Sequence, residues 1–185
     1  MLAPRATYAA LVQLPVRASI VTALRRPLLV ALIIGVSVSI AATGRATPAL
    51  VAGTTLSWSY IVLLQLAIAV ALVARGARRT VGLARALDLF FAGHAPWSLL
   101  VLAVAAWAPS PIGRPFWPVV VLAIVPILLT PRIVFAFFRE VLGMSARDAR
   151  RMTAVQQAAT WTSFVAIVWV SSALTPRALE LLGLS

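Results

Sequence analysis

Residues 50–74 read LVAGTTLSWSYIVLLQLAIAVALVA, twenty-five positions without one charged side chain, and the basic run RGARR follows at 75–79. About 20 apolar residues in a helix are enough to cross the roughly 30 Å hydrocarbon core of a bilayer. The stretch therefore predicts a membrane-spanning helix that ends among lipid head groups at Arg75.

Four more apolar stretches accompany it along the 185 residues, divided by glycine, proline and arginine. Gly44 and Arg45 introduce a tight turn, and the proline-rich residues 109–115 cannot continue a helix. We predict an all-α, polytopic transmembrane helical bundle, with short interfacial amphipathic helices, as one domain over residues 28–174. Its five spans are predicted at residues 28–43, 50–74, 89–108, 116–138 and 154–174.

The flanking segments are short. Residues 1–27 are expected to form a cytoplasmic, interfacial segment, with a helix interrupted by Pro15 and with Pro27 at the first position of the first span. Residues 175–185 are expected to form a short tail on the other side. A cleaved signal peptide is the alternative for the N-terminus, but about 26 residues precede the apolar run, which is too long a leader for one.

Charge gives the orientation. The chain is 62% hydrophobic with a mean hydropathy of +1.02, and its formal net charge is +12. All sixteen basic residues are arginines, and thirteen of them fall on one side of the predicted spans. The other side holds Arg45, Arg114 and Arg177. This positive-inside pattern predicts a cytoplasmic N-terminus and a non-cytoplasmic C-terminus. The absence of lysine is typical of a GC-rich bacterial genome, so we expect a bacterial inner-membrane protein.

Two cytoplasmic connections carry clustered arginines, which we interpret as orientation and anionic-lipid contacts, with a protein-docking surface as the alternative. These residues are Arg75, Arg78, Arg79, Arg147, Arg150 and Arg151. Asp88 is expected to pair with Arg85, three residues earlier. Gly143 is expected to end the fourth span, and Ser145 with Asp148 resembles a helix-capping box.

Small and polar residues inside the spans predict close helix packing in lipid. The candidates are Gly35, Ser39, Gly53, Ser57 and Gln65. We interpret them as contacts within one bundle, with Gln65 as an interhelical hydrogen-bond donor or acceptor. A dimerisation surface is the alternative.

Catalytic chemistry is sparse, because the only acidic residues are Asp88, Glu140, Asp148 and Glu180 and the only histidine is His94. We predict no enzyme activity, no metal site and no cofactor. His94 is expected at the cytoplasmic interface, hydrogen-bonded to a carbonyl freed by Pro96. A pigment or haem ligand, or a proton site, is the alternative for this residue. Pro126 and Pro131 predict a kinked fourth span, as some solute carriers have.

Five spans, a cytoplasmic N-terminus, a short outer tail and the run from Leu142 through Ser145 to Ala149 resemble the bacterial members of the Yip-type (Ypt-interacting protein) membrane family. The acidic, tyrosine-containing motif of the eukaryotic members is missing, and residues 88–93 are its only counterpart. The resemblance implies a non-enzymatic helical membrane protein and carries over no functional residue.

We therefore expect a non-catalytic integral membrane protein, a structural or accessory subunit of a membrane assembly. Its expected partners are membrane lipids, anionic head groups on the cytoplasmic side and other membrane subunits, and nucleic acid is not expected. The alternative is a ligand-carrying protein, with a pigment or haem on His94 or a small solute passing the fourth span.

Overall fold

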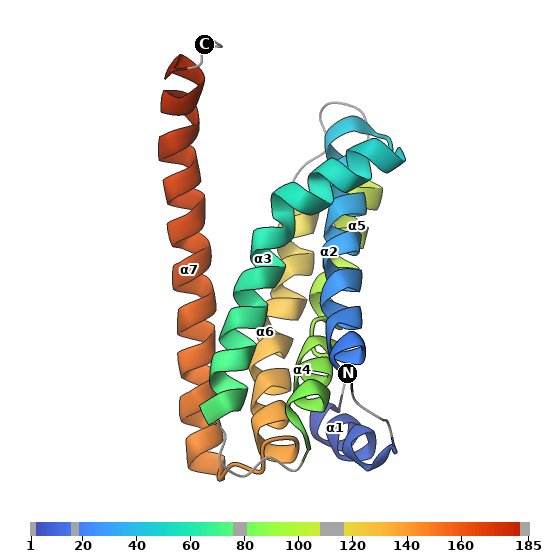
Figure 1. Cartoon of the computed structure of the whole chain (residues 1–185), viewed down its shortest axis with the longest axis vertical. Helices are drawn as coiled ribbons and strands as arrows, with labels where there is room; N and C mark the ends of the chain where they lie inside the picture. Colours follow the sequence, from blue (N-terminus) through green and yellow to red (C-terminus); the bar gives the residue numbers. More distant parts are fainter. Residues whose placement is uncertain (1–2, 16–18, 76–80, 108–116, 182–185) are drawn as a thin grey trace.

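The computed structural model describes residues 3–15, 19–75, 81–107 and 117–181, and these residues form seven α-helices and no strand (Figure 1). The predicted all-α fold class is confirmed. In Figure 1 the long helices run side by side, one short helix lies across one end, and the last helix extends along one side. In chain order they are α1 (Pro4–Gln13), α2 (Ile20–Thr43), α3 (Pro48–Arg75), α4 (Leu83–Ala92), α5 (Ala95–Trp107), α6 (Trp117–Glu140) and α7 (Ala146–Leu181).

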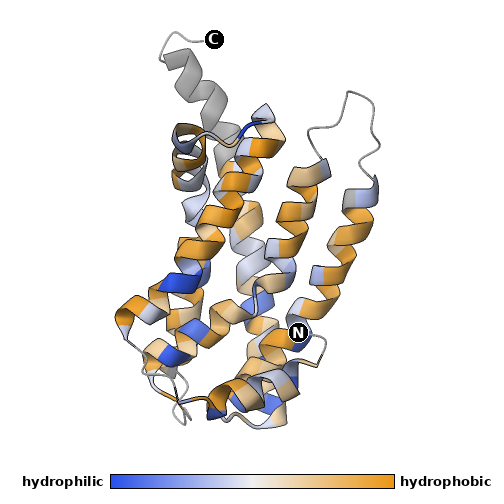
Figure 2. Cartoon of the chain, turned by 90° about the vertical axis from the view of Figure 1, so that its right-hand side faces the viewer, coloured by the Kyte–Doolittle hydropathy of each residue, from blue (hydrophilic) through white to orange (hydrophobic). Residues whose placement is uncertain are grey.

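Three of the described helices are long and apolar enough to cross a membrane. These are Ile20–Thr43, Pro48–Ala74 and Val120–Glu140. The pair α4 and α5 makes a fourth span if it is counted as one element, bent by 41° at its break. Figure 2 shows hydrophobic residues along most of the length of these helices, and several of the most hydrophilic ones near the end that carries α1. The chain therefore has the helices of a membrane protein.

The first span begins earlier than the sequence predicted. Ser19 and Thr22 form a capping box in which the Ser19 hydroxyl accepts from the Thr22 backbone N–H, so α2 starts at Ile20. Pro27, expected at the first helical position, is buried inside α2 instead. The predicted interfacial helix is shorter than expected, since α1 ends at Gln13.

The third span is not the single helix predicted for residues 89–108. Helix α4 ends at Ala92, and α5 begins at Ala95. Pro96 explains the break, because proline has no backbone N–H to bond the carbonyl four residues earlier and its ring crowds that carbonyl. Gly93 and His94 occupy the bend, so the only histidine lies at a discontinuity of the backbone.

Helix α6 runs unbroken through Pro126 and Pro131 to Glu140. Gly143 then adopts a φ of 63°, in the left-handed region that favours glycine, and turns the chain toward α7. The Ser145 hydroxyl accepts from the Asp148 backbone N–H over 3.2 Å and donates to the Asp148 carboxylate over 2.6 Å. The predicted N-terminal cap of α7 is thus present, although the carboxylate bonds to the hydroxyl of Ser145.

The best-packed part of the molecule is the end that carries α1, where α1, α4 and α6 meet. Tyr8 of α1 is fully buried there, its hydroxyl donates to the Leu89 carbonyl over 3.3 Å, and its ring meets Phe137 edge-on. Burial raises the pKa of the Tyr8 phenol, so it stays a neutral donor. The Arg85 guanidinium donates to the Leu11 carbonyl over 2.9 Å, which caps the last turn of α1.

Candidate functional site

The bundle contains a cavity of about 310 Å³ between α2, α3, α5, α6 and α7. Most of its wall is apolar, from aliphatic and aromatic side chains such as Ile34, Leu64, Val101, Ile127 and Phe137. Its volume falls at the lower end of the range for small-molecule sites, roughly 300–1,000 Å³. Among the described lining residues none is a carboxylate, an arginine or a lysine, so the wall suits a neutral and largely apolar molecule.

One side of the cavity is polar. Thr160 on α7 accepts a hydrogen bond from the Gln65 amide over 3.2 Å and another from the Gln156 amide over 3.1 Å. The Gln157 amide donates to the Gln156 carbonyl oxygen over 2.6 Å. Thr160 accepts both of its bonds through Oγ1, so its own hydroxyl hydrogen is available to an occupant, as are further amide donors and acceptors. A hydroxyl, carbonyl or amide group of a ligand can bind at this wall.

His94 lies on the cavity wall at the break between α4 and α5. Its ring stacks on Phe91, with centroids 4.9 Å apart, and lies tilted against Phe90 at 5.4 Å. The Phe90 carbonyl lies near the ring one turn earlier, yet no partner among the described residues meets hydrogen-bond geometry at Nδ1. The bond from His94 to a carbonyl freed by Pro96 therefore stays a prediction.

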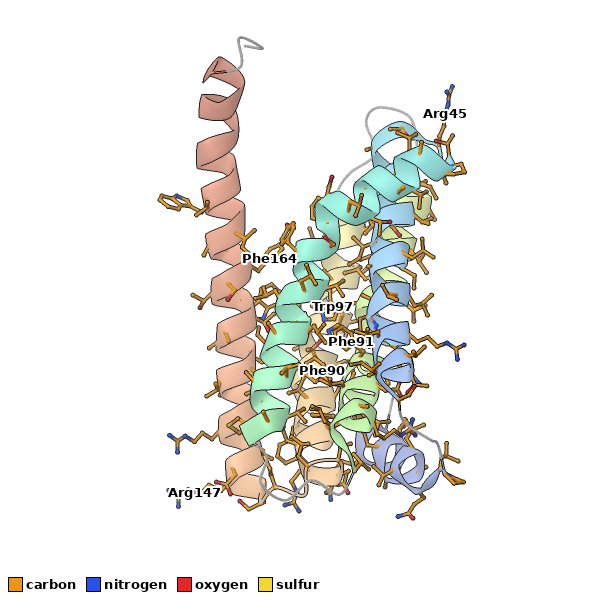
Figure 3. The ribbon with its side chains drawn as sticks, viewed as in Figure 1. Arg45, Phe90, Phe91, Trp97, Arg147 and Phe164 are labelled. Atoms are coloured by element: carbon orange, nitrogen blue, oxygen red, sulfur yellow. The ribbon has the colours of Figure 1, made fainter. Side chains whose placement is uncertain are left out.

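The neighbours of Gly93 show where His94 lies in the bundle, whereas its level in a membrane stays a prediction. A Cβ added to the adjacent Gly93 would lie 2.8 Å from Ile133 Cγ2. Ile133 precedes the end of α6 by seven residues, about 10 Å along the helix. His94 therefore packs inside the bundle, with its ring against Phe90 and Phe91, which are both labelled in Figure 3.

Aromatic rings close the cavity on the side of α7. The Trp97 indole of α5 donates to the Thr130 hydroxyl of α6 over 2.7 Å, and its ring meets Trp161 of α7 edge-on at 6.1 Å. Phe164, one turn further along α7, packs edge-on against Trp161 (Figure 3). The indole and hydroxyl of Trp97 and Thr130 are bonded to each other, so the polar wall around Thr160 is the more available binding surface.

The predicted packing residues divide between two environments. Gly35 and Ser39 are buried on α2, and the Ser39 hydroxyl donates to the Arg45 carbonyl over 2.7 Å, which holds the turn into α3. Gly53 and Ser57 lie on an exposed face of α3 instead. The residues of α3 that meet Gly35 are Thr54 and Thr55, which lie one and two positions after Gly53.

Gln65 is buried between α3 and α7, where its bond to Thr160 makes the interhelical contact expected of it. Arg147 and Arg151 are exposed near the start of α7, and Arg147 points away from the bundle in Figure 3. Arg150, although exposed, lines a separate hollow together with residues of α1 and α6. Arg78, Arg79 and the Arg75 side chain lie outside the described residues.

The predicted pair of Asp88 with Arg85 is present at 2.8 Å, and a second partner was missed. Arg26 of α2 donates to the other Asp88 oxygen over 2.5 Å, so one buried carboxylate joins α2 to α4. Asp88 is 62 positions from Arg26 in the sequence and offers no local signal, so this contact was not predictable.

The hydrogen bond between Gln156 and Thr160 did have a sequence signal, since polar residues four apart on a predicted span share one helix face.

In the described part of the chain, no three residues among histidine, cysteine, aspartate and glutamate come together in a group that could hold a metal ion.

Comparison with protein-family models, curated proteins and solved structures found no match.

Proposed function

We propose that this protein is a non-catalytic, five-span integral membrane protein whose bundle holds a lipophilic molecule carrying a neutral hydrogen-bonding group. The cavity of about 310 Å³, apolar except at the Gln65 and Thr160 side, is the observation that carries the proposal. Helices α2, α3 and α6, the bent pair and α7 would be the five spans. The end with α1 would face the bacterial cytoplasm, as the arginine distribution predicts.

Energetics favour an occupied cavity. Because most of the wall is apolar, a molecule with an apolar body fits the space better than water does. Ordered water is a poor substitute where most of the wall is apolar, because a buried water needs two to four polar partners. A molecule with an apolar body and one hydroxyl, carbonyl or amide group satisfies both parts of the wall.

His94 contributes to the same site in this proposal. His94 lines the same cavity as the amides of α7, its buried Nδ1 has no partner among the described residues, and a neutral imidazole can either donate or accept. The haem alternative has less support, since one imidazole stacked against Phe91 supplies a single axial ligand and the volume is small.

The test is native mass spectrometry of protein extracted in mild detergent, followed by identification of any released molecule. Ser98 lines the cavity, so Ser98→Phe fills it, whereas Leu99→Phe adds a ring at a position that is 67% exposed. We expect one class of neutral lipophilic molecule on the wild type and on Leu99→Phe, and its loss from Ser98→Phe. A wild type that carries only detergent or bulk phospholipid, or a Ser98→Phe variant that keeps the molecule, would contradict the proposal.

An accessory-subunit function is the second candidate. Helix α7 contacts α3 and α6 but leaves large apolar side chains exposed on its outer side, among them Val165 and Trp169. Another membrane protein can cover these side chains as well as lipid can. Co-purification after gentle extraction tests this, with loss of one stoichiometric partner expected in Val165→Ala if the surface is an interface.

The relationship to the Yip-type family remains a prediction from the sequence. It adds no residue to the site.

A further inference from the structure

Helix α1 lies across one end of the bundle, and one of its side chains reaches the cavity (Figure 1). Among the described residues of α1, that side chain is Tyr8. Tyr8 is 0% exposed, whereas Ala6, Ala9 and Ala10 on the same helix are exposed. On this side, the thickness of one helix therefore separates the cavity from the surface of the protein.

Phe137 shows which end of the cavity Tyr8 occupies. The two rings meet edge-on, with centroids 5.9 Å apart. Along α6 the cavity wall runs from Ile127 to Phe137, about 15 Å at 1.5 Å per residue. Tyr8 therefore lies at the end of the cavity that is nearest to the end of α6.

The break between α4 and α5 provides the hydrogen-bond partner of Tyr8. In a continuous helix, the Gly93 backbone N–H would bond to the Leu89 carbonyl, four residues earlier. Here it bonds to the Phe90 carbonyl over 3.0 Å. The Tyr8 hydroxyl donates to the Leu89 carbonyl over 3.3 Å instead. Since a buried backbone carbonyl needs a donor, Tyr8 docks α1 on the bend by satisfying one.

Gly93 also leaves the space that the Tyr8 hydroxyl occupies. A Cβ at position 93 would lie 2.9 Å from the Tyr8 hydroxyl oxygen and 2.8 Å from Ile133 Cγ2. A methyl group there would push the hydroxyl away from the Leu89 carbonyl. The bend and Tyr8 are therefore fitted to each other, although 85 positions separate Tyr8 from Gly93.

We propose that α1 is a plug whose Tyr8 side chain closes the cavity toward the end of the bundle where α1 lies. Opening on this side requires Tyr8 to leave the Leu89 carbonyl and α1 to move away from the bend. The plug controls one route by which water or an occupant reaches the cavity. It requires the cavity alone, so it does not rest on the proposed ligand.

Thiol accessibility tests the plug, because the chain contains no cysteine. Ser98 lines the cavity, so Ser98→Cys places a single thiol there. In lipid nanodiscs, a charged methanethiosulfonate reagent reaches this thiol from water and not through lipid. We expect slow labelling with Tyr8 in place. Tyr8→Ala removes a buried ring and leaves a space, so it should speed labelling on the order of a hundredfold. Tyr8→Phe loses one hydrogen bond and keeps the ring, so labelling should rise by at most roughly fivefold.

Phe138→Ala is the matched control, because Phe138 is as buried as Tyr8 and does not line the cavity. It should leave labelling of Ser98→Cys close to the rate with Phe138 in place. Gly93→Ala should speed labelling by displacing the Tyr8 hydroxyl, and combining it with Tyr8→Phe should remove most of that increase. Because both of these variants keep a ring at position 8, they test the plug independently of whether Tyr8→Ala folds.

Three results would overturn the inference. Fast labelling with Tyr8 in place would show that water reaches the cavity without displacement of α1. Equal acceleration by Tyr8→Ala and Phe138→Ala would show general loosening of the bundle. No acceleration by Tyr8→Ala or by Gly93→Ala would show that α1 closes nothing. Retention of a cavity ligand is measured separately by native mass spectrometry, so each of these results removes the plug and leaves the proposed function standing.

Discussion

Replacing Gly35 by alanine tests the closest helix crossing in the bundle, where α2 packs on α3. A methyl group at position 35 would lie 2.8 Å from Thr55 Cβ and 2.9 Å from Thr55 Cα. The second atom is backbone, so no rotation of the Thr55 side chain relieves the clash and the helices must separate. Separation would also strain the hydrogen bond from the Thr54 hydroxyl to the Gly35 carbonyl, 2.7 Å long.

The chain supplies its own control. Gly53 lies on α3 with no heavy atom within 4 Å of an added Cβ, so Gly53→Ala changes helix propensity alone. Both substitutions gain up to about 1 kcal/mol from that propensity, which cancels when the two variants are compared. Overpacking costs about 1–3 kcal/mol and the hydrogen bond about 1 kcal/mol. Gly35→Ala should therefore be less stable than Gly53→Ala by roughly 2–4 kcal/mol.

Thermal unfolding followed by circular dichroism in one detergent measures this difference. We expect Gly35→Ala to melt on the order of 10 °C below Gly53→Ala. Adding Thr55→Gly to Gly35→Ala removes Thr55 Oγ1 and Cβ, two of the three clashing atoms, and should recover part of the loss. Equal melting temperatures for Gly35→Ala and Gly53→Ala would refute the close approach of α2 and α3.

The remaining predictions concern buried polar groups. Asp88→Ala leaves Arg85 buried without its carboxylate and unlinks Arg26, so it should destabilise the protein by about 3 kcal/mol in detergent unfolding. Glu140→Ala removes only the exposed pair with Arg5 and should cost less than about 1 kcal/mol; a similar loss for both would count against the buried network. His94→Phe keeps the stack on Phe91 and removes the unpaired nitrogen, so stability should stay within about 1 kcal/mol of the wild type while the cavity ligand is retained less well. Retention of the ligand by His94→Phe at wild-type level would exclude His94 from the site.

The sequence predicted the features that depend on local composition. The apolar runs predicted α2, α3 and α6, and Gly143 predicted the end of α6. The spacing of three residues predicted the ion pair of Asp88 with Arg85. Each of these follows from neighbouring residues and the helical repeat. The predicted start of α2 was wrong because Pro27 was placed at the first helical position. The capping box of Ser19 and Thr22 lies more than one helical turn before Pro27, and it starts the helix at Ile20.

The site itself depends on contacts that are distant in sequence. His94 was expected in the first turns of a continuous third span, but it lies at the break between α4 and α5, where Gly93 packs against Ile133. Tyr8 gave no pattern in a short N-terminal segment, yet it fixes α1. The face of α3 that meets α2 was missed because small residues recur on both sides of that helix, and only the crossing at Gly35 decides between them.

The proposed orientation depends on five crossings, which would place the α1 end in the cytoplasm and the two ends of α7 on opposite sides. The chain contains no cysteine, so single-cysteine variants can be labelled without background. Ser145→Cys and Ser185→Cys, treated with a membrane-impermeant maleimide on intact cells and again after lysis, report those two sides. With five crossings, Ser145→Cys should react only after lysis and Ser185→Cys should react in intact cells. Labelling of both positions in intact cells, or of neither, would contradict the five-span arrangement.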